Sequence, residues 1–215
     1  MIPPPVFVTA RLNSTRLPRK HFLDIGGISV INHIIARLIH FGFNPYICVP
    51  DEDCEAFLDH TQDGPIFGGD ANDVKNRLFK IAVRTKTKKF HQLDGDDPWF
   101  DERAIAMSFN AGGTILPPVE SDDGSGICGT TFDLTAMEEK RYLLWNDRRA
   151  YPQRLTLDYP EDHHLITAVN RMVGEYMAPR WAVDELFVKN PDLHKINWFR
   201  TAEWKARQDA EKSGH

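Results

Sequence analysis

The stretch that decides the fold runs Val6-Phe7-Val8-Thr9-Ala10 and continues as Arg11-Leu12-Asn13-Ser14-Thr15-Arg16-Leu17-Pro18-Arg19-Lys20. Its first five residues predict a short strand, and the polar, proline-containing residues after them predict a loop. A helix comes next, because apolar residues from Val30 to Ile39 repeat at helical spacing between a Ser29 N-cap and Gly42. A strand, a loop and a helix in this order are typical of the first unit of an α/β fold.

The same alternation continues along the chain. We predict further strands over residues 46–49, 65–67 and 90–93, and helices over residues 52–60 and from Asn72, which can act as an N-cap. Strands and helices that alternate at this spacing predict a mostly parallel sheet with helices on both faces. Such sheets bind ligands at the carboxyl ends of their strands, so residues that follow a predicted strand are the first candidates for a site.

The second half of the chain completes one domain. In chain order we predict a helix from about Asp101, a strand over 114–116, a helix from a Thr135/Glu138 capping box to Leu144, a strand over 154–158, a helix starting at Pro160 and a helix over 181–189. We expect the Gly- and Asp-rich loop 120–126 to act as a lid. Residues 1–200 then form a single domain, and residues 201–215 form a charged C-terminal tail.

Composition excludes several classes of protein. The 215 residues carry 26 Lys and Arg against 31 Asp and Glu, a net charge of −5, and 41% of them are hydrophobic. These values favour an ordered globular chain and disfavour a general nucleic-acid binder. No apolar run is long enough to span a membrane, and the N-terminus lacks the pattern of an export signal. The cysteines Cys48, Cys54 and Cys128 are an odd number without CxxC spacing, which favours reduced thiols and a cytoplasmic location.

The loop after the first predicted strand concentrates positive charge. Arg11, Arg16, Arg19 and Lys20 lie within ten residues in a chain that is acidic as a whole. Arginine guanidinium groups, a lysine ammonium and the amides of a turn can together bind the oxygens of a triphosphate. The alternative is a solvated basic loop without a ligand.

Two groups of carboxylates follow later strands. Residues 94–98 read Asp-Gly-Asp-Asp-Pro after one strand, and residues 157–162 read Leu-Asp-Tyr-Pro-Glu-Asp after another. Carboxylates from two strand ends can jointly hold Mg²⁺ while water and phosphate oxygens complete its coordination. The alternative is local chemistry, since Asp beside Gly and Pro favours turns and acidic residues favour helix N-termini.

These groups together resemble the cytidylyltransferases of surface-polysaccharide biosynthesis. That group includes the spore-coat polysaccharide synthesis type and, more distantly, the CMP-Kdo and CMP-sialic acid synthetases. The matching residues are Arg11, Ser14 to Pro18 and Lys20 in the loop, Gly69 to Arg77, Gly95 to Pro98 with Asp101, Leu157-Asp158 with Pro160 to Asp162, and Lys189-Asn190-Pro191 to Ile196-Asn197.

The resemblance implies a Rossmann-like, three-layer nucleotide-diphospho-sugar transferase fold. It also implies an Mg²⁺-dependent nucleotidyltransferase, acting as a homodimer, that joins CTP to an acidic sugar and releases pyrophosphate. By the same resemblance Arg11, Lys20 and Asp96 are catalytic, Asp96 and Asp158 bind Mg²⁺, and the nucleotide is bound by Ala10, Arg11, Ser14, Arg16, Lys20, Arg77 and Asp96.

The sequence also departs from the family's pattern. Gln92 or a neighbour replaces an arginine, Asp94 adds a carboxylate, and Tyr159 stands where the family has threonine. Only 62 residues separate Asp96 from Asp158 (158 − 96), so the acceptor-binding segment is short. Two further hypotheses therefore remain open. The first is nucleotidyl transfer to a phosphorylated sugar or polyol, or from another nucleoside triphosphate. The second is a non-catalytic nucleotide-binding relative that docks on a partner enzyme through its aromatic tail.

Overall fold

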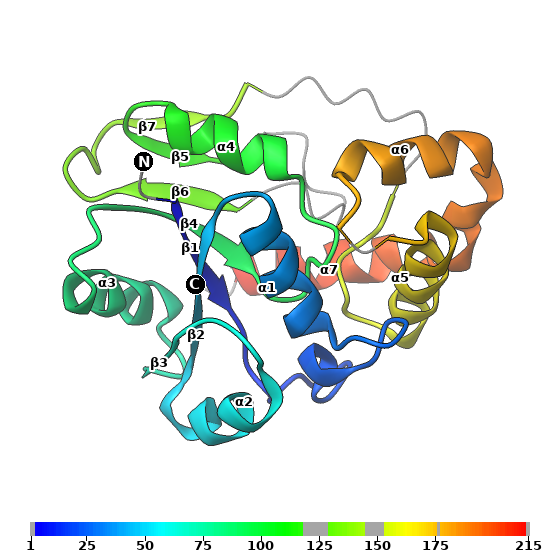
Figure 1. Ribbon diagram of the computed structural model, residues 1–215, viewed down its shortest axis with the longest axis horizontal. Coiled ribbons are helices and arrows are strands. Elements are labelled where there is room, and N and C mark those ends of the chain that lie inside the picture. Colours follow the sequence, from blue (N-terminus) through cyan, green and yellow to red (C-terminus); the bar gives the residue numbers. More distant parts are fainter. Residues whose placement is uncertain (1–2, 118–128, 145–152, 176, 214–215) are drawn as a thin grey trace.

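A seven-stranded mixed sheet forms the centre of the molecule in the computed structural model (Figure 1). The structure describes residues 3–117, 129–144, 153–175 and 177–213. The strands are β1 (Pro5–Thr9), β2 (Asn44–Pro50), β3 (Ile66–Gly69), β4 (Lys89–Asp94), β5 (Thr114–Leu116), β6 (Thr130–Asp133) and β7 (Lys140–Tyr142), in the order β3-β2-β1-β4-β6-β5-β7. The pairs β1–β2, β1–β4, β2–β3 and β5–β7 are parallel, and β6 is antiparallel to β4 and β5. The prediction of a mostly parallel sheet is confirmed.

Helices cover both faces of this sheet. They are α1 (Val30–His40), α2 (Cys54–His60), α3 (Val74–Arg84), α4 (Glu102–Asn110), α5 (Pro160–Val173), α6 (Arg180–Lys189) and α7 (Arg200–Ser213). Val6 and Val8 of β1 lie in the core with α1, whereas Phe7, between them, packs on the other face against Leu78 of α3. This alternation is the two-residue period of a strand buried on both faces. The three-layer α/β prediction is therefore confirmed.

Two predicted elements of the second half are wrong. Residues 135–144 form a turn and β7 instead of a helix. The Thr135 hydroxyl and amide both donate to Asp133 Oδ1, at 2.6 and 3.0 Å, and the Ala136 amide donates to Asp133 O, so these residues are held in a turn after β6. Residues 154–158 form no strand. The Leu157 amide donates to Asp96 O at 2.8 Å, and the Asp158 amide donates to the Asp162 side chain, so neither amide pairs with a neighbouring strand. One smaller detail also differs, since Asp73 and not Asn72 caps α3.

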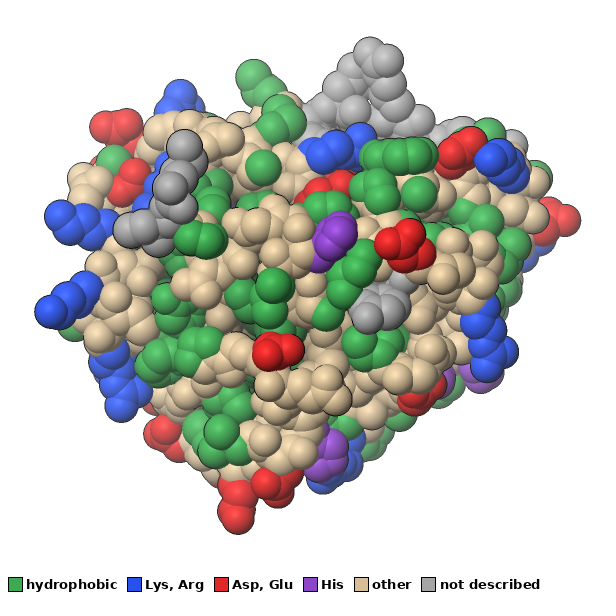
Figure 2. All heavy atoms as spheres, viewed as in Figure 1, with side chains coloured by type: hydrophobic (Ala, Val, Ile, Leu, Met, Phe, Trp, Pro, Cys, Tyr) green, Lys and Arg blue, Asp and Glu red, His purple; other side chains and the backbone are tan. Residues whose placement is uncertain are grey.

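The surface shown in Figure 2 carries its charges mainly around the rim. Hydrophobic and uncharged atoms occupy the centre of this face, and lysine and arginine side chains stand as separate groups. No helix among the described residues combines the length and apolar character needed to cross a membrane. Cys48 is buried and Cys54 half-buried, both as free thiols. Cys128 and the predicted lid, residues 120–126, lie outside the described residues.

The site is set up where β1 and β4 end side by side. The Gly95 amide donates to Thr9 O at 2.8 Å, and a Cβ at Gly95 would lie 2.7 Å from the same oxygen. Only glycine permits this close approach without a shift of the backbone. The basic loop after β1 and the acidic loop after β4 are thereby brought together, at the carboxyl ends of two parallel strands.

Candidate active site

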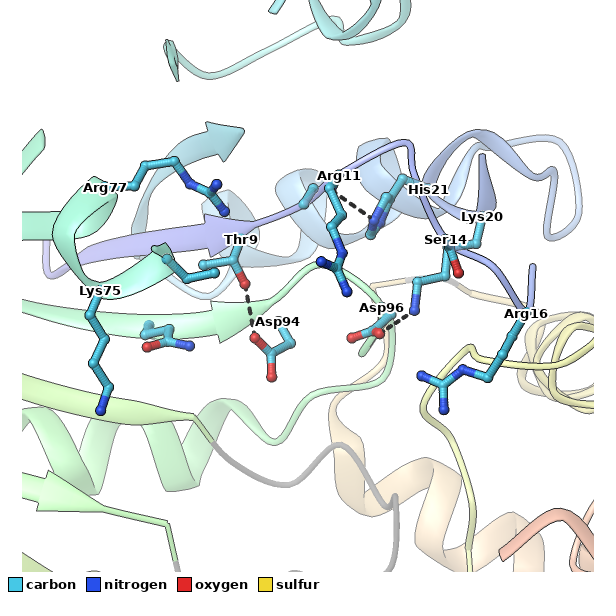
Figure 3. A pocket seen from close by; sticks show the side chains of 13 residues that line it. Thr9, Arg11, Ser14, Arg16, Lys20, His21, Lys75, Arg77, Asp94 and Asp96 are labelled. Carbon is cyan, nitrogen blue, oxygen red and sulfur yellow. Dashed lines mark hydrogen bonds and ion pairs between the residues drawn. The ribbon is translucent and has the colours of Figure 1, made fainter. Parts of the chain in front are cut away.

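A polar cavity of about 370 Å³ opens at the ends of β1 and β4 (Figure 3). Its lining residues are Thr9, Ala10, Arg11, Ser14, Arg16, Lys20, His21, Val74, Lys75, Arg77, Gln92, Asp94 and Asp96. Five of these side chains are cationic and two are carboxylates, so the cavity is positive in a protein whose net charge is −5. A strongly anionic ligand suits this charge.

Two hydrogen bonds of backbone amides fix the loop after β1. The Leu12 amide donates to Asp53 Oδ2 at 2.9 Å, and the Leu17 amide donates to Ser14 Oγ at 3.4 Å. The first bond ties the loop to the residue before α2, and the second closes a turn within the loop. Figure 3 shows the Arg11 and Lys20 side chains reaching toward Asp96, with Arg16 beyond them.

Lys20 lies between two carboxylates that are far apart in the sequence. Its ammonium donates to Asp96 Oδ2, and to Asp158 Oδ1 at 3.0 Å. Burial opposes the charged form of Lys20, but the two carboxylates outweigh it and raise its pKa. Burial likewise works against the carboxylate of Asp96, yet the Lys20 charge and hydrogen bond lower the pKa of Asp96. Both groups are therefore held in their charged forms.

Asp158 is buried among cations. Its Oδ1 accepts from Arg16 Nη2 at 2.8 Å as well as from Lys20, and its Oδ2 lies 3.5 Å from Arg154 Nη2. Asp96 and Asp158 thus converge on one cationic atom, Lys20 Nζ, which marks a point where both can hold a positive charge. That donor set, two carboxylates beside a cavity with room for phosphate oxygens and water, fits Mg²⁺.

A cluster of carboxylates extends beyond the two predicted metal ligands. Asp94, Asp96 and Asp97 each offer an oxygen, and these oxygens lie within 4.8 Å of one another. Burial and the neighbouring carboxylates of Asp96 and Asp94 raise the pKa of Asp97 well above its ordinary value, and its Oδ1 accepts from Thr156 Oγ1 at 2.7 Å. Asp94 Oδ1 accepts from Thr9 Oγ1 at 2.8 Å. From the sequence, Asp94 belongs to the candidate carboxylate group 94–98 and is an added carboxylate, but only Asp96 of that group is expected to bind the metal.

His21 supports the cavity as a neutral group. Its Nδ1 donates to Gly95 O at 2.8 Å, and its Nε2 accepts from the Arg11 amide at 3.3 Å, so one ring nitrogen carries the proton. Burial and the charge of Lys20 lower the pKa of His21 to about 4. The neutral ring joins the basic loop to the acidic one.

Acid should destabilise the protein through its buried histidines. Burial also lowers the pKa values of His33 and His91 to about 3. In the unfolded chain all three histidines have the ordinary pKa of 6.5, so between these values the unfolded chain binds protons that the folded chain does not. Their stabilising contribution is complete above the unfolded value and is lost as pH falls toward the folded values. From about pH 7 to about pH 5 we expect a loss of about 2 kcal/mol per histidine, measured as urea unfolding at each pH. The His21→Gln variant should lose less stability than the unmodified protein over this interval, and equal losses would contradict the assignment.

Arg77 enters the cavity from α3. Its stem lies against Gly69, where a Cβ would come within 2.7 Å of Arg77 Cγ, and its Nη1 donates to Asp70 O at 2.6 Å. Its Nε is buried with no hydrogen-bond partner among the described residues. Burial and the nearby charge of Arg11 lower the pKa of Arg77. An unpartnered buried N–H of an arginine is a group that a ligand oxygen would satisfy.

All seven residues predicted to bind a nucleotide line this one cavity. Asp158 is not in the lining, but Lys20 and Arg16 join it to the cavity. The lining residues that were not predicted from the sequence as site residues are Thr9, His21, Val74, Lys75, Gln92 and Asp94. Thr9 and Asp94 could have been found, because each is the last residue of a strand.

Comparisons with known proteins show which proteins this chain is similar to. Residues 6–111 match the family model described as cytidylyltransferase. The chain is 24% identical over 235 residues to the spore coat polysaccharide biosynthesis protein SpsF of Bacillus subtilis, covering 86% of this chain and 94% of that protein. It is 36% identical over 114 residues to a 3-deoxy-manno-octulosonate cytidylyltransferase of Methylorubrum extorquens, covering 50% of this chain and 46% of the relative.

The fold also matches a solved structure. A cytidylyltransferase from Leptospira borgpetersenii superposes with a TM-score of 0.76 at 19% identity, covering 90% of this chain and 96% of that one. The structural match shows a shared fold, and the sequence matches indicate the family to which the chain is similar. The comparisons support a nucleotidyltransferase enzyme that is similar to the cytidylyltransferases, with the family-model match lying over residues 6–111.

Proposed function

We propose that this protein is an Mg²⁺-dependent cytidylyltransferase that transfers CMP from CTP to an acidic sugar, resembling Kdo or sialic acid, and releases pyrophosphate. The observation that carries the proposal is that Arg11, Arg16, Lys20 and Asp96 line one cavity, and that Asp158 is joined to it through Arg16 and Lys20. A site that only bound a small anion would need the cations without the two carboxylates.

The cations hold the triphosphate. Arg11, Arg16 and Lys20 lie along one side of the cavity, and Lys75 and Arg77 enter from α3. We assign the phosphates to these groups, with Ser14 and the Ala10 end of β1 beside them. An acceptor hydroxyl then attacks the α-phosphorus, the bond to the bridging oxygen of the β-phosphate breaks, and pyrophosphate leaves. Arg11 and Lys20 stabilise the charge that grows on the leaving group, so positioning and electrostatics supply most of the catalysis.

Asp96 and Asp158 would hold the magnesium ion. Both carboxylates already share one cation, Lys20, and Asp96 belongs to a group of three whose oxygens lie close together. When bound, Mg²⁺ would act as a Lewis acid on phosphate oxygens.

The acceptor is inferred from the relatives. One is named for spore coat polysaccharide biosynthesis and another for 3-deoxy-manno-octulosonate, a sugar acid, which supports a role in surface glycan synthesis. We include in the proposal a homodimer located in the cytoplasm, and residues 1–200 as the catalytic domain.

Thermal shift with CTP, UTP, ATP and GTP tests nucleotide choice and metal dependence. A ligand that binds only the folded state raises the melting temperature, and we expect CTP with Mg²⁺ to raise it by about 5–10 °C near saturation. CTP without Mg²⁺ and the other nucleotides with Mg²⁺ serve as controls and should give smaller shifts. Equal shifts with every nucleotide would contradict the choice of cytosine, and no shift with any nucleotide would contradict nucleotide binding altogether.

A further inference from the structure

Asp158 lies in a segment without regular secondary structure, so its position has to be fixed by other means. No strand ladder includes residues 153–159. Asp162, at the start of α5, accepts from the backbone amides of Asp158 and Tyr159, both at 2.9 Å, through Oδ2. This carboxylate therefore holds the backbone on which Asp158 is placed.

Asp162 is in turn held by two buried side chains. Arg154 Nε donates to Asp162 Oδ1 at 2.9 Å, and Asn197 Nδ2 donates to the same oxygen at 2.8 Å. Asn197 Nδ2 also donates to the backbone oxygen of Arg154 at 2.8 Å. Asp162 and Asn197 are fully buried and Arg154 is 2% exposed. Both donor hydrogens of the Asn197 amide are thus used to join Asp162 to Arg154.

Arg154 faces both carboxylates at once. Its Nη2 lies 3.2 Å from Asp162 Oδ2 and 3.5 Å from Asp158 Oδ2. This occupies one oxygen of Asp158 and leaves Oδ1 directed to Arg16 and Lys20 at the cavity. The guanidinium of Arg154 also lies 5.3 Å from the centre of the Trp204 ring of α7. The C-terminal segment therefore reaches the site through Asn197 and Trp204.

Asn197 is a costly residue to bury at this point. Its side-chain oxygen has no hydrogen-bond partner among the described residues, and an unpaired buried polar atom lowers stability. The placement is explained by its two donated hydrogen bonds, which specify the geometry of Arg154 and Asp162.

We propose that Asn197 is a positioning residue that, through Asp162 and Arg154, sets the Asp158 carboxylate for divalent-cation binding. Asn197 is not among the residues that line the cavity. The inference rests on the proposed function insofar as Asp158 holds the metal. It also gives the C-terminal Ile196-Asn197 segment, 39 residues after Asp158 (197 − 158), a role at the site.

The test compares Asn197→Ala with Asn190→Ala. Asn190, in the same C-terminal segment, donates to Leu186 O and has no contact with Asp162. We expect Asn197→Ala to weaken Mn²⁺ binding, followed by the electron paramagnetic resonance signal of free Mn²⁺, by about 10-fold or more. The Mg²⁺ concentration for half-maximal activity should rise by a similar factor, while kcat at saturating Mg²⁺ stays near that of the unmodified enzyme. Asn190→Ala should leave both values unchanged.

Several outcomes decide the inference. A folded Asn197→Ala protein with unchanged Mn²⁺ affinity would overturn it, as would a fall in kcat at saturating metal with no change in metal affinity. If Asn197→Ala does not fold, Trp204→Leu takes its place, because it removes the ring beside Arg154 without altering a buried polar group. It should weaken Mn²⁺ binding in the same direction, by a smaller factor. Absence of product from the unmodified protein would overturn the proposed function, but a loss of Mn²⁺ affinity in the variant would still support the positioning role.

Discussion

The Asp96→Asn variant is expected to lose nucleotidyl transfer by about 10²- to 10³-fold while remaining folded. The amide keeps the shape of the carboxylate but removes its charge, so the cation shared with Asp158 loses one of its two anionic partners. Asp96 retains 20% side-chain exposure, and Lys20 keeps its hydrogen bond to Asp158, so a large loss of stability is not expected. Steady-state release of pyrophosphate, with circular dichroism as a check of folding, measures the effect.

The control for this prediction is Asp133→Asn. Asp133 lies at the end of β6, and its carboxylate accepts from Thr135 rather than from a group of the cavity. Activity of that variant should stay near the unmodified value. Near-normal turnover by Asp96→Asn at every Mg²⁺ concentration would contradict the assignment of Asp96 as a metal ligand.

The Lys20→Met variant is expected to separate catalysis from metal binding. Nucleotidyl transfer should fall by about 10²- to 10³-fold, because the ammonium that neutralises the phosphates is gone. Affinity for Mn²⁺ in the absence of nucleotide should rise, because Lys20 occupies the point between Asp96 and Asp158 where a cation is held. Loss of the buried ammonium should also lower the melting temperature, and Mn²⁺ should raise it more in the variant than in the unmodified protein.

Lys75→Met provides the matched control for Lys20→Met. Lys75 lines the same cavity from α3, and no hydrogen bond or ion pair joins it to either carboxylate in the described part of the chain. Its replacement should weaken nucleotide binding without changing Mn²⁺ affinity. Reduced Mn²⁺ affinity in Lys20→Met would contradict competition between the lysine and the metal at this point.

The first half of the fold could be predicted from sequence because its signals are local. Three features each depend on neighbours in the chain. They are the strand predicted over residues 6–10 and found as β1 (Pro5–Thr9), the Ser29 cap, whose oxygen accepts from the Asn32 amide, and the stop at Gly42. The errors arose where a side chain competes with the backbone. Asp133 accepts both the hydroxyl and the amide of Thr135, which places Thr135 in a turn, and Asp162 accepts the amide of Asp158.

Some residues of the site could likewise be predicted from the sequence, and others could not. The basic loop and the Asp96 and Asp158 motifs could be recognised as short patterns. The structure brings the loop and Asp96 to one cavity and joins Asp158 to them through Arg16 and Lys20. Asn197 could not be assigned a role, because it acts on Asp162 across 35 residues and through a hydrogen bond that no spacing rule predicts. The neutral state of His21 likewise depends on its burial against Gly95 and the Arg11 amide.

Phosphorus NMR of CTP incubated with the protein, Mg²⁺ and a sugar acid tests the central claim most directly. The proposal predicts one new CMP phosphodiester signal and an equal amount of pyrophosphate, formed only when acceptor and Mg²⁺ are both present. Formation of CDP with inorganic phosphate, or CTP that stays intact with every sugar acid although it binds the folded protein, would contradict it.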